Sequence, residues 1–380
     1  MSTLIVLAAL ALIAVVLHDG FEVILLPRRV SRDIRITRLF YISTWRLWRT
    51  AVLRMSSHRR RELLLSWFGP LSILGLFLLW ASILILSFGA IHWALGTPMN
   101  ATATPGIGDD LYFSGVTFFT LGFGDIAPVG PVGRSLAVIE AGLGFAFLAV
   151  VISYLPVFYQ AFSNREITIS LLDARAGSPP QASSLLIRLA PSRNFGALDR
   201  FLQEWERWAA EVLESHLSFP LLSYYRSQHD NQSWLAALTV ILDASALVIA
   251  GVKGGDPYQA QLTFAMARHA VVDIAQVFRA RPSDPEVDRL PPEGLTALLD
   301  ELQLAGLELR ESSAVGPKLA ELRRLYEPFV AALSAYFLLP LPPIRAEAAP
   351  VDNWQTSAWM KRAGGIGQLA RSEPDDDHAE

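Results

Sequence analysis

The residues whose types and spacing suggest specific chemistry form the stretch 120–125, with the sequence Thr-Leu-Gly-Phe-Gly-Asp. Main-chain carbonyl groups that point the same way can replace the hydration shell of a bare cation with successive layers of oxygen atoms. Such a row of carbonyl groups needs a backbone that alternates between left-handed and right-handed conformations. Gly122 and Gly124 permit the positive φ angles that the left-handed conformation requires. The stretch therefore predicts a cation-binding loop, whose oxygen ligands come from Thr120, Leu121, Gly122 and Phe123.

A Gly-x-Gly pattern alone usually marks a turn in a soluble loop, so the flanking segments decide its meaning. Apolar runs over residues 63–95 and 132–162 are each long enough to span a bilayer, which needs about 20 residues. Between them, residues 110–119 form an aromatic, helix-like run that is too short to span, with Asp109 or Asp110 available as its N-terminal cap. Irregular backbone at membrane depth is tolerated only where it is buried in protein or lines a water-filled cavity. The order helix, short helix, glycine loop, helix therefore predicts a cation-conducting pore.

This arrangement resembles the pore-loop potassium channels, whose signature Thr-Val-Gly-Tyr-Gly-Asp differs from this chain at Leu121 and Phe123. The resemblance covers about residues 63–162, and it implies potassium as the conducted ion. The tyrosine of that family carries a hydroxyl that braces the filter, and Phe123 lacks it, so a weakly selective channel for sodium and potassium is an alternative. An aromatic pair and a threonine upstream of the loop also match the family, at Tyr112, Phe113 and Thr117.

Residues that would support or gate the pore flank the loop. Glu140 lies inside the second apolar run, where a carboxylate is costly unless it is paired or faces water. It either buttresses the short helix behind the filter or serves helix packing alone. Gly142 and Gly144 allow bending or close packing where potassium channels carry a hinge glycine, and Pro156 should kink the helix near a gate. The predicted filter-supporting residues are Thr117, Gly124, Asp125 and Glu140, with Gly142, Gly144 and Pro156 as hinge and gate residues.

The loop occurs once in the chain, and no internal repeat of the pore unit is present. One loop cannot close a ring, so we expect a homotetramer around a shared axis. Passive flux needs no catalytic residue, so an enzyme is not expected, and potassium is the conducted ion with no organic cofactor evident. A membrane-tethered enzyme or sensor with a non-conducting pore is the alternative from another class.

The N-terminal part predicts one more spanning helix and a basic segment after it. Residues 3–26 are long enough to span, and no basic residue precedes the apolar run as a signal peptide would require. Eleven Arg and a single acidic residue, Asp33, follow between Arg28 and Arg61. By the positive-inside rule, the N-terminus lies outside the plasma (inner) membrane and the basic segment lies inside. The basic segment is amphipathic, so it predicts either binding to anionic lipid head groups or packing on the cytoplasmic domain.

Beyond the pore, the apolar spacing is mostly helical, which predicts a helical cytoplasmic domain. Residues 167–172 alternate weakly and predict a short strand or an extension. Two apolar runs, 234–252 and 328–341, are interpreted as core helices of this domain rather than membrane spans. No nucleotide-binding fingerprint and no Arg-rich spanning helix occur, so the gating ligand stays unknown and a voltage sensor is not indicated.

A loose set of polar residues in this domain suggests a second kind of site. The order His, His-Asp, Asp is similar to that of histidine-aspartate hydrolases, which would make it a metal or phosphohydrolase site. Buried polar groups that bond one another between helices are the alternative, and a ligand pocket that gates the channel lies between the two. The residues concerned are His216, His229, Asp230, Asp243, His269 and Asp273.

The composition agrees with a membrane protein that carries a soluble portion, because 52% of the 380 residues are hydrophobic. The chain has no Cys, which excludes disulfides and thiolate sites, and its net charge of -4 does not suggest nucleic acid. The expected fold class is an all-α membrane protein, with a tetrameric potassium-channel-like pore domain, an extra N-terminal transmembrane helix and a helical cytoplasmic domain. The predicted segments are 1–26, 27–62, 63–163, 164–343 and a flexible tail, 344–380.

Overall fold

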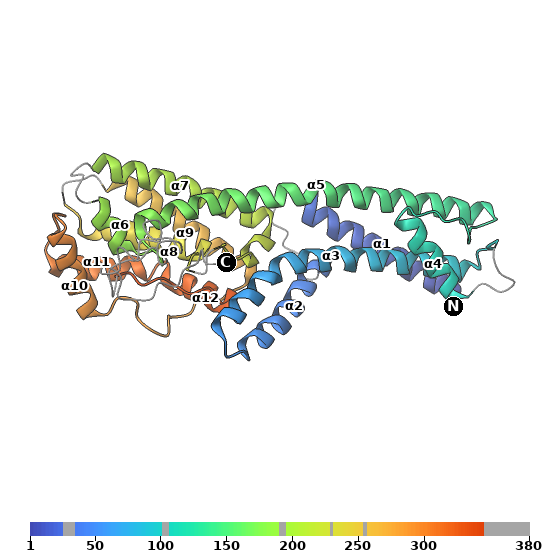
Figure 1. Ribbon diagram of the computed structural model, residues 1–380, viewed down its shortest axis with the longest axis horizontal. Coiled ribbons are helices and arrows are strands. Elements are labelled where there is room, and N and C mark those ends of the chain that lie inside the picture. The colour runs from blue at the N-terminus through green and yellow to red at the C-terminus, as the bar shows by residue number, and fades with distance from the viewer. Residues whose placement is uncertain (26–34, 101–105, 190–194, 229–230, 254–256, 346–380) are drawn as a thin grey trace, which may run out of the picture. The chain divides into compact units, whose positions relative to one another are not determined.

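The computed structural model describes residues 1–25, 35–100, 106–189, 195–228, 231–253 and 257–345 (Figure 1). The predictions for His229, Asp230, the first arginines of the basic segment and nearly all of the tail lie outside these residues. The chain divides into two compact units, Met1–Gln160 and Ala161–Glu380, and the predicted boundary after residue 163 lies close to this division. The described residues are helical apart from turns, loops and two isolated β-bridges.

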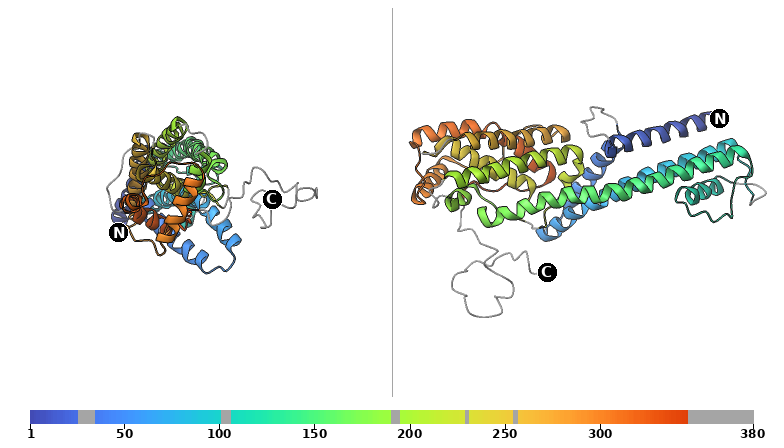
Figure 2. Two further views of the ribbon diagram at one scale, coloured as in Figure 1. Left: turned by 90° about the vertical axis from the view of Figure 1, so that its left-hand side faces the viewer. Right: turned by 90° about the horizontal axis from the view of Figure 1, so that it is seen from above.

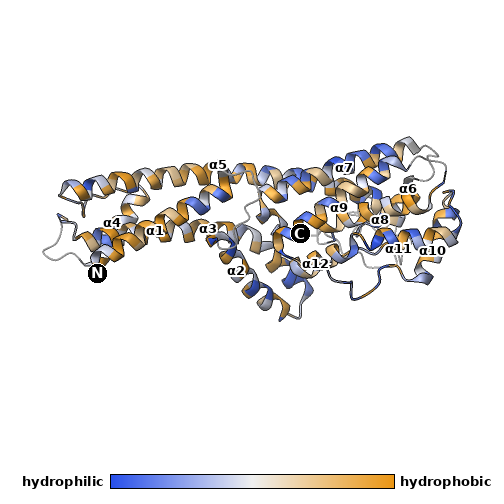
Figure 3. Ribbon diagram, turned by 180° about the vertical axis from the view of Figure 1, so that it is seen from behind, coloured by the Kyte–Doolittle hydropathy of each residue, from blue (hydrophilic) through white to orange (hydrophobic). Residues whose placement is uncertain are grey.

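Three long apolar helices dominate the first unit: α1 (Ser2–Gly20), α3 (His58–Leu95) and α5 (Pro131–Ala176). Each is long and apolar enough to cross a membrane. In Figure 3, α1, α3 and the first part of α5 are mostly hydrophobic. A short π-helix, η1 (Phe21–Leu25), continues α1. The chain is therefore a multi-pass membrane protein whose predicted spans correspond to helices.

The helix α5 extends beyond its predicted end at residue 162, and residues 167–172 are helical rather than a strand. No Gly or Pro lies between Pro156 and the end of the helix. Gly177, with a φ of 83°, follows the last helical residue. The alternation of apolar and polar residues in the sequence would place Ile167, Ile169 and Leu171 on one face of a strand, whereas in the helix Ile169 is buried and Ile167 and Leu171 are exposed.

The basic segment contains the helix α2 (Ile36–Leu53), whose aromatic face packs on α3. Trp45 is buried, with its ring centroid 4.8 Å from that of Phe68, and the Trp48 indole donates to the Leu64 carbonyl at 3.0 Å. The apolar face of α2 is thus directed at the protein.

A buried carboxylate that the sequence did not single out, Asp19, joins three helices of this unit. It accepts hydrogen bonds from the backbone N–H and the hydroxyl of Thr37 at 3.0 and 2.6 Å, and from the Trp80 indole at 3.1 Å. Because Thr37 lies in the first turn of α2, Asp19 satisfies an N–H group that the helix itself leaves open. The neighbouring pair His18 and Glu22, 3.4 Å apart, has a half-exposed histidine.

The second unit is a bundle of helices that lie side by side around α8 (Trp234–Gly251) (Figures 1 and 2). Although α8 is apolar enough to span a membrane, 94% of its apolar window is buried inside the protein, against 11% for α5. This burial favours its interpretation as a core helix. The other elements are α6 (Ala182–Leu189), α7 (Phe195–Ser218), η3 (Pro220–Tyr224), α9 (Tyr258–Phe278), α10 (Pro292–Leu304), α11 (Ser312–Arg323) and α12 (Glu327–Phe337).

Candidate ion-conduction site

The short helix before the glycine loop is α4 (Ile107–Phe118), which starts three residues earlier than predicted. Its N-cap is Gly106 rather than Asp109 or Asp110, and the Asp109 carboxylate accepts the Gly106 N–H at 2.9 Å from within the first turn. A cap without a side chain is workable here because the N3 carboxylate supplies the capping contact. The 12 residues of α4 extend about 18 Å, too short for a bilayer. The negative end of the helix dipole at its C-terminus favours a cation beyond it.

The backbone of the loop alternates between positive and negative φ angles. Positive φ angles occur at Thr120 (56°), Gly122 (60°) and Gly124 (77°), that is, at every second residue. The sequence predicted this conformation for the two glycines and missed it at Thr120, because a β-branched residue rarely adopts it. Two backbone hydrogen bonds to the last turn of α4 hold Thr120 in this strained conformation. They join Thr120 N–H to Thr117 O at 3.0 Å and Leu121 N–H to Val116 O at 2.9 Å.

The carbonyl groups of the loop are the next feature of the site. Within the part of the chain that the structure describes, none of the carbonyl oxygens of residues 120–123 accepts a hydrogen bond. Residues 120–124 are all exposed within the single chain, so these carbonyl groups are open to a partner from outside it. The side chains of Leu121 and Phe123 are exposed within the single chain.

The C-terminal end of the loop is tied to α4 by a side-chain hydrogen bond. The Tyr112 hydroxyl donates to Asp125 Oδ2 at 2.9 Å. Tyr112 was predicted only as one member of an aromatic pair, and its bond gives Asp125 a partner on the short helix. A hydroxyl thus braces the loop from α4, although Phe123 itself has none.

Behind α4, Glu140 is fully buried and contacts the Ser114 hydroxyl, which also lies 2.8 Å from the Ile85 carbonyl oxygen. His92 Nε2 is 3.9 Å from Glu140 Oε2, and His92 Nδ1 lies 3.1 Å from the Thr97 hydroxyl. Glu140 therefore lies where α3, α4 and α5 meet, against the short helix as the buttress hypothesis requires. His92 was missed as a site residue because nothing in its local sequence pairs it with a residue 48 positions away.

The two glycines predicted as hinge positions differ in their surroundings. A Cβ atom on Gly144 would lie 1.9 Å from the Phe118 carbonyl oxygen, so this glycine lets α5 touch the end of α4. A Cβ atom on Gly142 would meet nothing within 4 Å inside the chain. Pro156 lies within α5, which is assigned as helix on both sides of it. Close packing thus accounts for Gly144, and the gating roles of Gly142 and Pro156 stay predictions.

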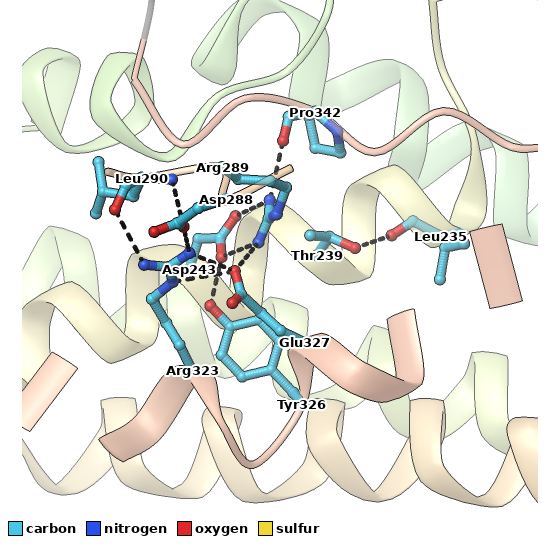
Figure 4. Close-up of polar contacts among 10 residues, drawn as sticks. All are labelled: Leu235, Thr239, Asp243, Asp288, Arg289, Leu290, Arg323, Tyr326, Glu327 and Pro342. Carbon is cyan, nitrogen blue, oxygen red and sulfur yellow. Dashed lines mark hydrogen bonds and ion pairs between the residues drawn. The ribbon is translucent and has the colours of Figure 1, made fainter. Parts of the chain in front are cut away.

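The polar residues of the second unit that the structure describes do not form one site. Asp243 binds Arg289 through both carboxylate oxygens, at 2.8 and 2.9 Å, and accepts the Tyr326 hydroxyl at 2.5 Å (Figure 4). Glu327 receives Arg289 at 3.2 Å and Arg323 at 3.0 Å. Burial and the Asp243 carboxylate raise the pKa of Tyr326 well above its ordinary value. Burial lowers the pKa of Arg289, but the Asp243 carboxylate beside it raises this pKa above its ordinary value.

His216 lies elsewhere, with its ring centroid 4.9 Å from that of Trp234 and its Nε2 3.4 Å from the Arg165 guanidinium. Burial and then Arg165 lower the pKa of His216 to about 3. His269 pairs with Asp273 at 3.4 Å on α9. Among the described residues, no group of three or more His, Cys, Asp or Glu is placed to hold a metal ion. The geometry thus favours groups that bond one another over a hydrolase centre, because Asp243 and Asp273, the described acids of the set, each have a basic partner.

Comparison with known proteins finds a family whose model matches the predicted pore segment. Residues 73–161, which include the loop and Glu140, match the model of the family described as "Ion channel". The chain is 24% identical over 271 residues to the "Uncharacterized membrane protein YdjJ" of Bacillus subtilis (strain 168), covering 68% of this chain and 76% of that protein. That match is longer than the pore segment, so the similarity continues outside it.

Two further relatives are described as "Protein LctB", from Bacillus caldotenax and Geobacillus stearothermophilus. Each is 33% identical over 85 residues, which is 20% of this chain and 63% of the relative. The chain therefore spans less than two thirds of these relatives. No solved structure matches the chain. The matched family and the helix–short helix–loop–helix geometry agree that residues 73–161 form an ion-channel pore domain.

Proposed function

We propose that this protein is a potassium-selective channel that conducts potassium passively through a pore built by four copies of the chain. The observation that carries the proposal is the loop 120–124, in which positive φ angles at every second residue accompany carbonyl groups that lack protein partners. Such a backbone presents a ladder of oxygen atoms to a dehydrated cation. The ion-binding carbonyls are those of Thr120, Leu121, Gly122 and Phe123, with the Thr120 hydroxyl at the inner end.

The number of chains follows from the single loop. One loop supplies one side of a coordination shell, and potassium filters are closed by four loops around an axis. The exposed side chains of Leu121 and Phe123 then face neighbouring copies rather than the ion. Glu140 and the Tyr112–Asp125 bond hold the loop from behind and from its outer end.

In this proposal the N-terminus lies outside the plasma membrane, and the basic helix α2 and the second unit lie in the cytoplasm. The arginines of α2, of the turn after it and of the first turn of α3, which include Arg46, Arg54 and Arg60, then bind anionic lipid head groups. The second unit, joined to the pore by α5, gates the channel or holds its copies together.

A weakly selective channel for sodium and potassium is the second candidate, and Phe123 is the observation that favours it. The experiment that separates the two is the reversal potential of the purified protein in liposomes, with potassium on one side and sodium on the other. A large reversal potential, negative on the potassium side, supports the selective channel. A reversal potential near zero, at equal ion concentrations, contradicts selectivity and leaves the pore itself intact.

A further inference from the structure

The buried Ser114 hydroxyl lies between two oxygen atoms and has one hydrogen to donate. It is 2.8 Å from the Ile85 carbonyl oxygen of α3, and it also contacts Glu140 Oε1 of α5. A hydroxyl group donates one hydrogen bond and can accept two. The Ile85 carbonyl can only accept, and an ionised Glu140 could only accept as well. Both contacts are therefore hydrogen bonds only if Glu140 carries a proton and donates to Ser114.

An ionised Glu140 would lack a close counter-charge. Its Oε2 is 3.9 Å from His92 Nε2, and both atoms are buried without a hydrogen-bond partner in the part of the chain that the structure describes. A charged histidine and a carboxylate would close to about 2.7–2.9 Å. Arg134, on the same helix, instead donates from Nε to the Pro128 carbonyl oxygen at 3.3 Å. A buried carboxylate without a partner is costly, which favours the neutral acid.

His92 is held away from Glu140 by contacts of its own. Its Nδ1 lies 3.1 Å from the Thr97 hydroxyl, near the end of α3. Its ring centroid is 5.2 Å from that of Phe113, a residue of α4, in an edge-to-face arrangement. The fully buried histidine thus encloses the carboxyl group without forming a closed ion pair with it.

A proton on Glu140 would act on the position of α4. Glu140 meets α4 at Ser114. One turn further along both helices, Gly144 of α5 meets α4 at Phe118. The last turn of α4 supplies the backbone contacts that hold Thr120 at its positive φ angle. A hydrogen bond from Glu140 to Ser114 therefore fixes the helix that holds the start of the loop.

We propose that Glu140 is protonated in the conducting channel and positions the loop by donating a hydrogen bond to Ser114, which in turn donates to the Ile85 carbonyl. The inference rests on the proposed channel function and adds a neutral acid as a positioning residue behind the loop. The two consecutive hydrogen bonds join α5 to α4 and α4 to α3. The three helices around the loop are thus connected at one buried point.

Infrared difference spectroscopy tests the protonation without any ion flux. The full-length protein in liposomes at neutral pH is compared with Glu140→Gln. The control is Glu321→Gln, at a glutamate whose side chain is 56% exposed. We expect Glu140→Gln to remove the carbonyl band of a protonated carboxyl group and Glu321→Gln to remove carboxylate bands only. A Glu140→Gln difference that contains carboxylate bands alone would overturn the proposal.

Reversal potentials of the variants test the positioning role. The amide of Glu140→Gln can donate as the protonated acid does, so this variant should keep the ratio of potassium to sodium permeability. Ser114→Ala removes the group that joins the helices and should lower the ratio about two- to tenfold. Ser72→Ala is the matched control, because its buried hydroxyl donates at 2.8 Å to Gly69 O on its own helix, α3. An unchanged ratio in Ser114→Ala, or an equal fall in Glu140→Gln, contradicts the positioning role.

The two measurements separate this inference from the channel function on which it rests. The protonated band together with the expected permeability ratios supports the inference. Selective flux without the band overturns it and leaves the channel standing. No potassium flux through the natural protein contradicts the channel function, and the positioning role fails with it.

Discussion

The loop 120–124 and the Asp243 cluster of the second unit differ in whether their oxygen atoms accept hydrogen bonds from the protein. In the cluster, both oxygens of Asp243 are bonded to protein groups, with Arg289 as counter-charge and Tyr326 as hydroxyl donor. In the loop, the carbonyl oxygens of residues 120–123 accept no hydrogen bond within the described chain. Buried oxygen atoms that are satisfied internally stabilise a fold, whereas unpaired ones held in a fixed ladder are available to an ion.

The comparison teaches that charge is a poor guide to the functional site here. Asp243, which suggested a metal or hydrolase centre, is paired with Arg289, whereas the proposed ion chemistry belongs to the uncharged loop 120–124. Substitutions in the two regions should therefore separate stability from selectivity.

The largest effect is expected for Asp243→Ala, which leaves the Arg289 guanidinium buried without its main partner. Breaking a buried ion pair from one side costs about 3–5 kcal/mol. We expect a fall of that size in the free energy of unfolding of the second unit, measured by denaturant titration, with the reversal potential of surviving channels unchanged. Glu321→Ala, which breaks the exposed Lys318–Glu321 pair, is the control and should cost less than about 1 kcal/mol. Equal losses in the two variants would show that the cluster is not a stabilising element.

A smaller effect per pH unit is expected from the protonation of His216. Its pKa is about 3 in the folded protein, against an ordinary value of 6.5 for a solvated histidine, so between these values the unfolded chain binds more protons. Stability should therefore fall as the pH falls through this window, by at most about 1.4 kcal/mol per pH unit. The variant His216→Gln should lack this part of the pH dependence, whereas His269→Gln, at an exposed position, should keep it. The same slope in both variants would rule out His216 as its source.

The smallest change in free energy is expected for Tyr112→Phe, which removes one hydrogen bond to Asp125. A single hydrogen bond contributes about 0.5–1.5 kcal/mol, so the ratio of potassium to sodium permeability should fall by about two- to tenfold. Unfolding should hardly change. Tyr258→Phe removes a hydroxyl from the exposed surface of the second unit and is the matched control. A permeability ratio that is the same in both variants would mean that the hydroxyl does not brace the filter.

The features that the sequence predicted well are those that depend on local pattern. The three spanning helices, the short helix and the left-handed glycines Gly122 and Gly124 follow from apolar run length and backbone sterics. The features that it missed depend on contacts between distant segments. Arg289 reaches Asp243 across 46 residues, Asp19 reaches Trp80 across 61, and the strained Thr120 is held by the end of α4.

The length of α5 was underestimated for a different reason. A run of polar residues after Phe162 was interpreted as the end of the membrane helix, although nothing in it breaks a helix. The end of an apolar run indicates where a helix leaves the membrane, whereas Gly and Pro indicate where a helix ends. In α5 these two positions differ.

The central claim is that ions pass through the loop 120–124, and potassium flux into liposomes that contain Gly122→Asp tests it most directly. Gly122 has a positive φ angle and open space around it, and Gly306 in the second unit shares both features, so Gly306→Asp is the matched control. We predict that Gly122→Asp abolishes potassium flux while Gly306→Asp conducts like the natural protein, with equal amounts of assembled protein in both. Undiminished flux through Gly122→Asp would contradict the claim.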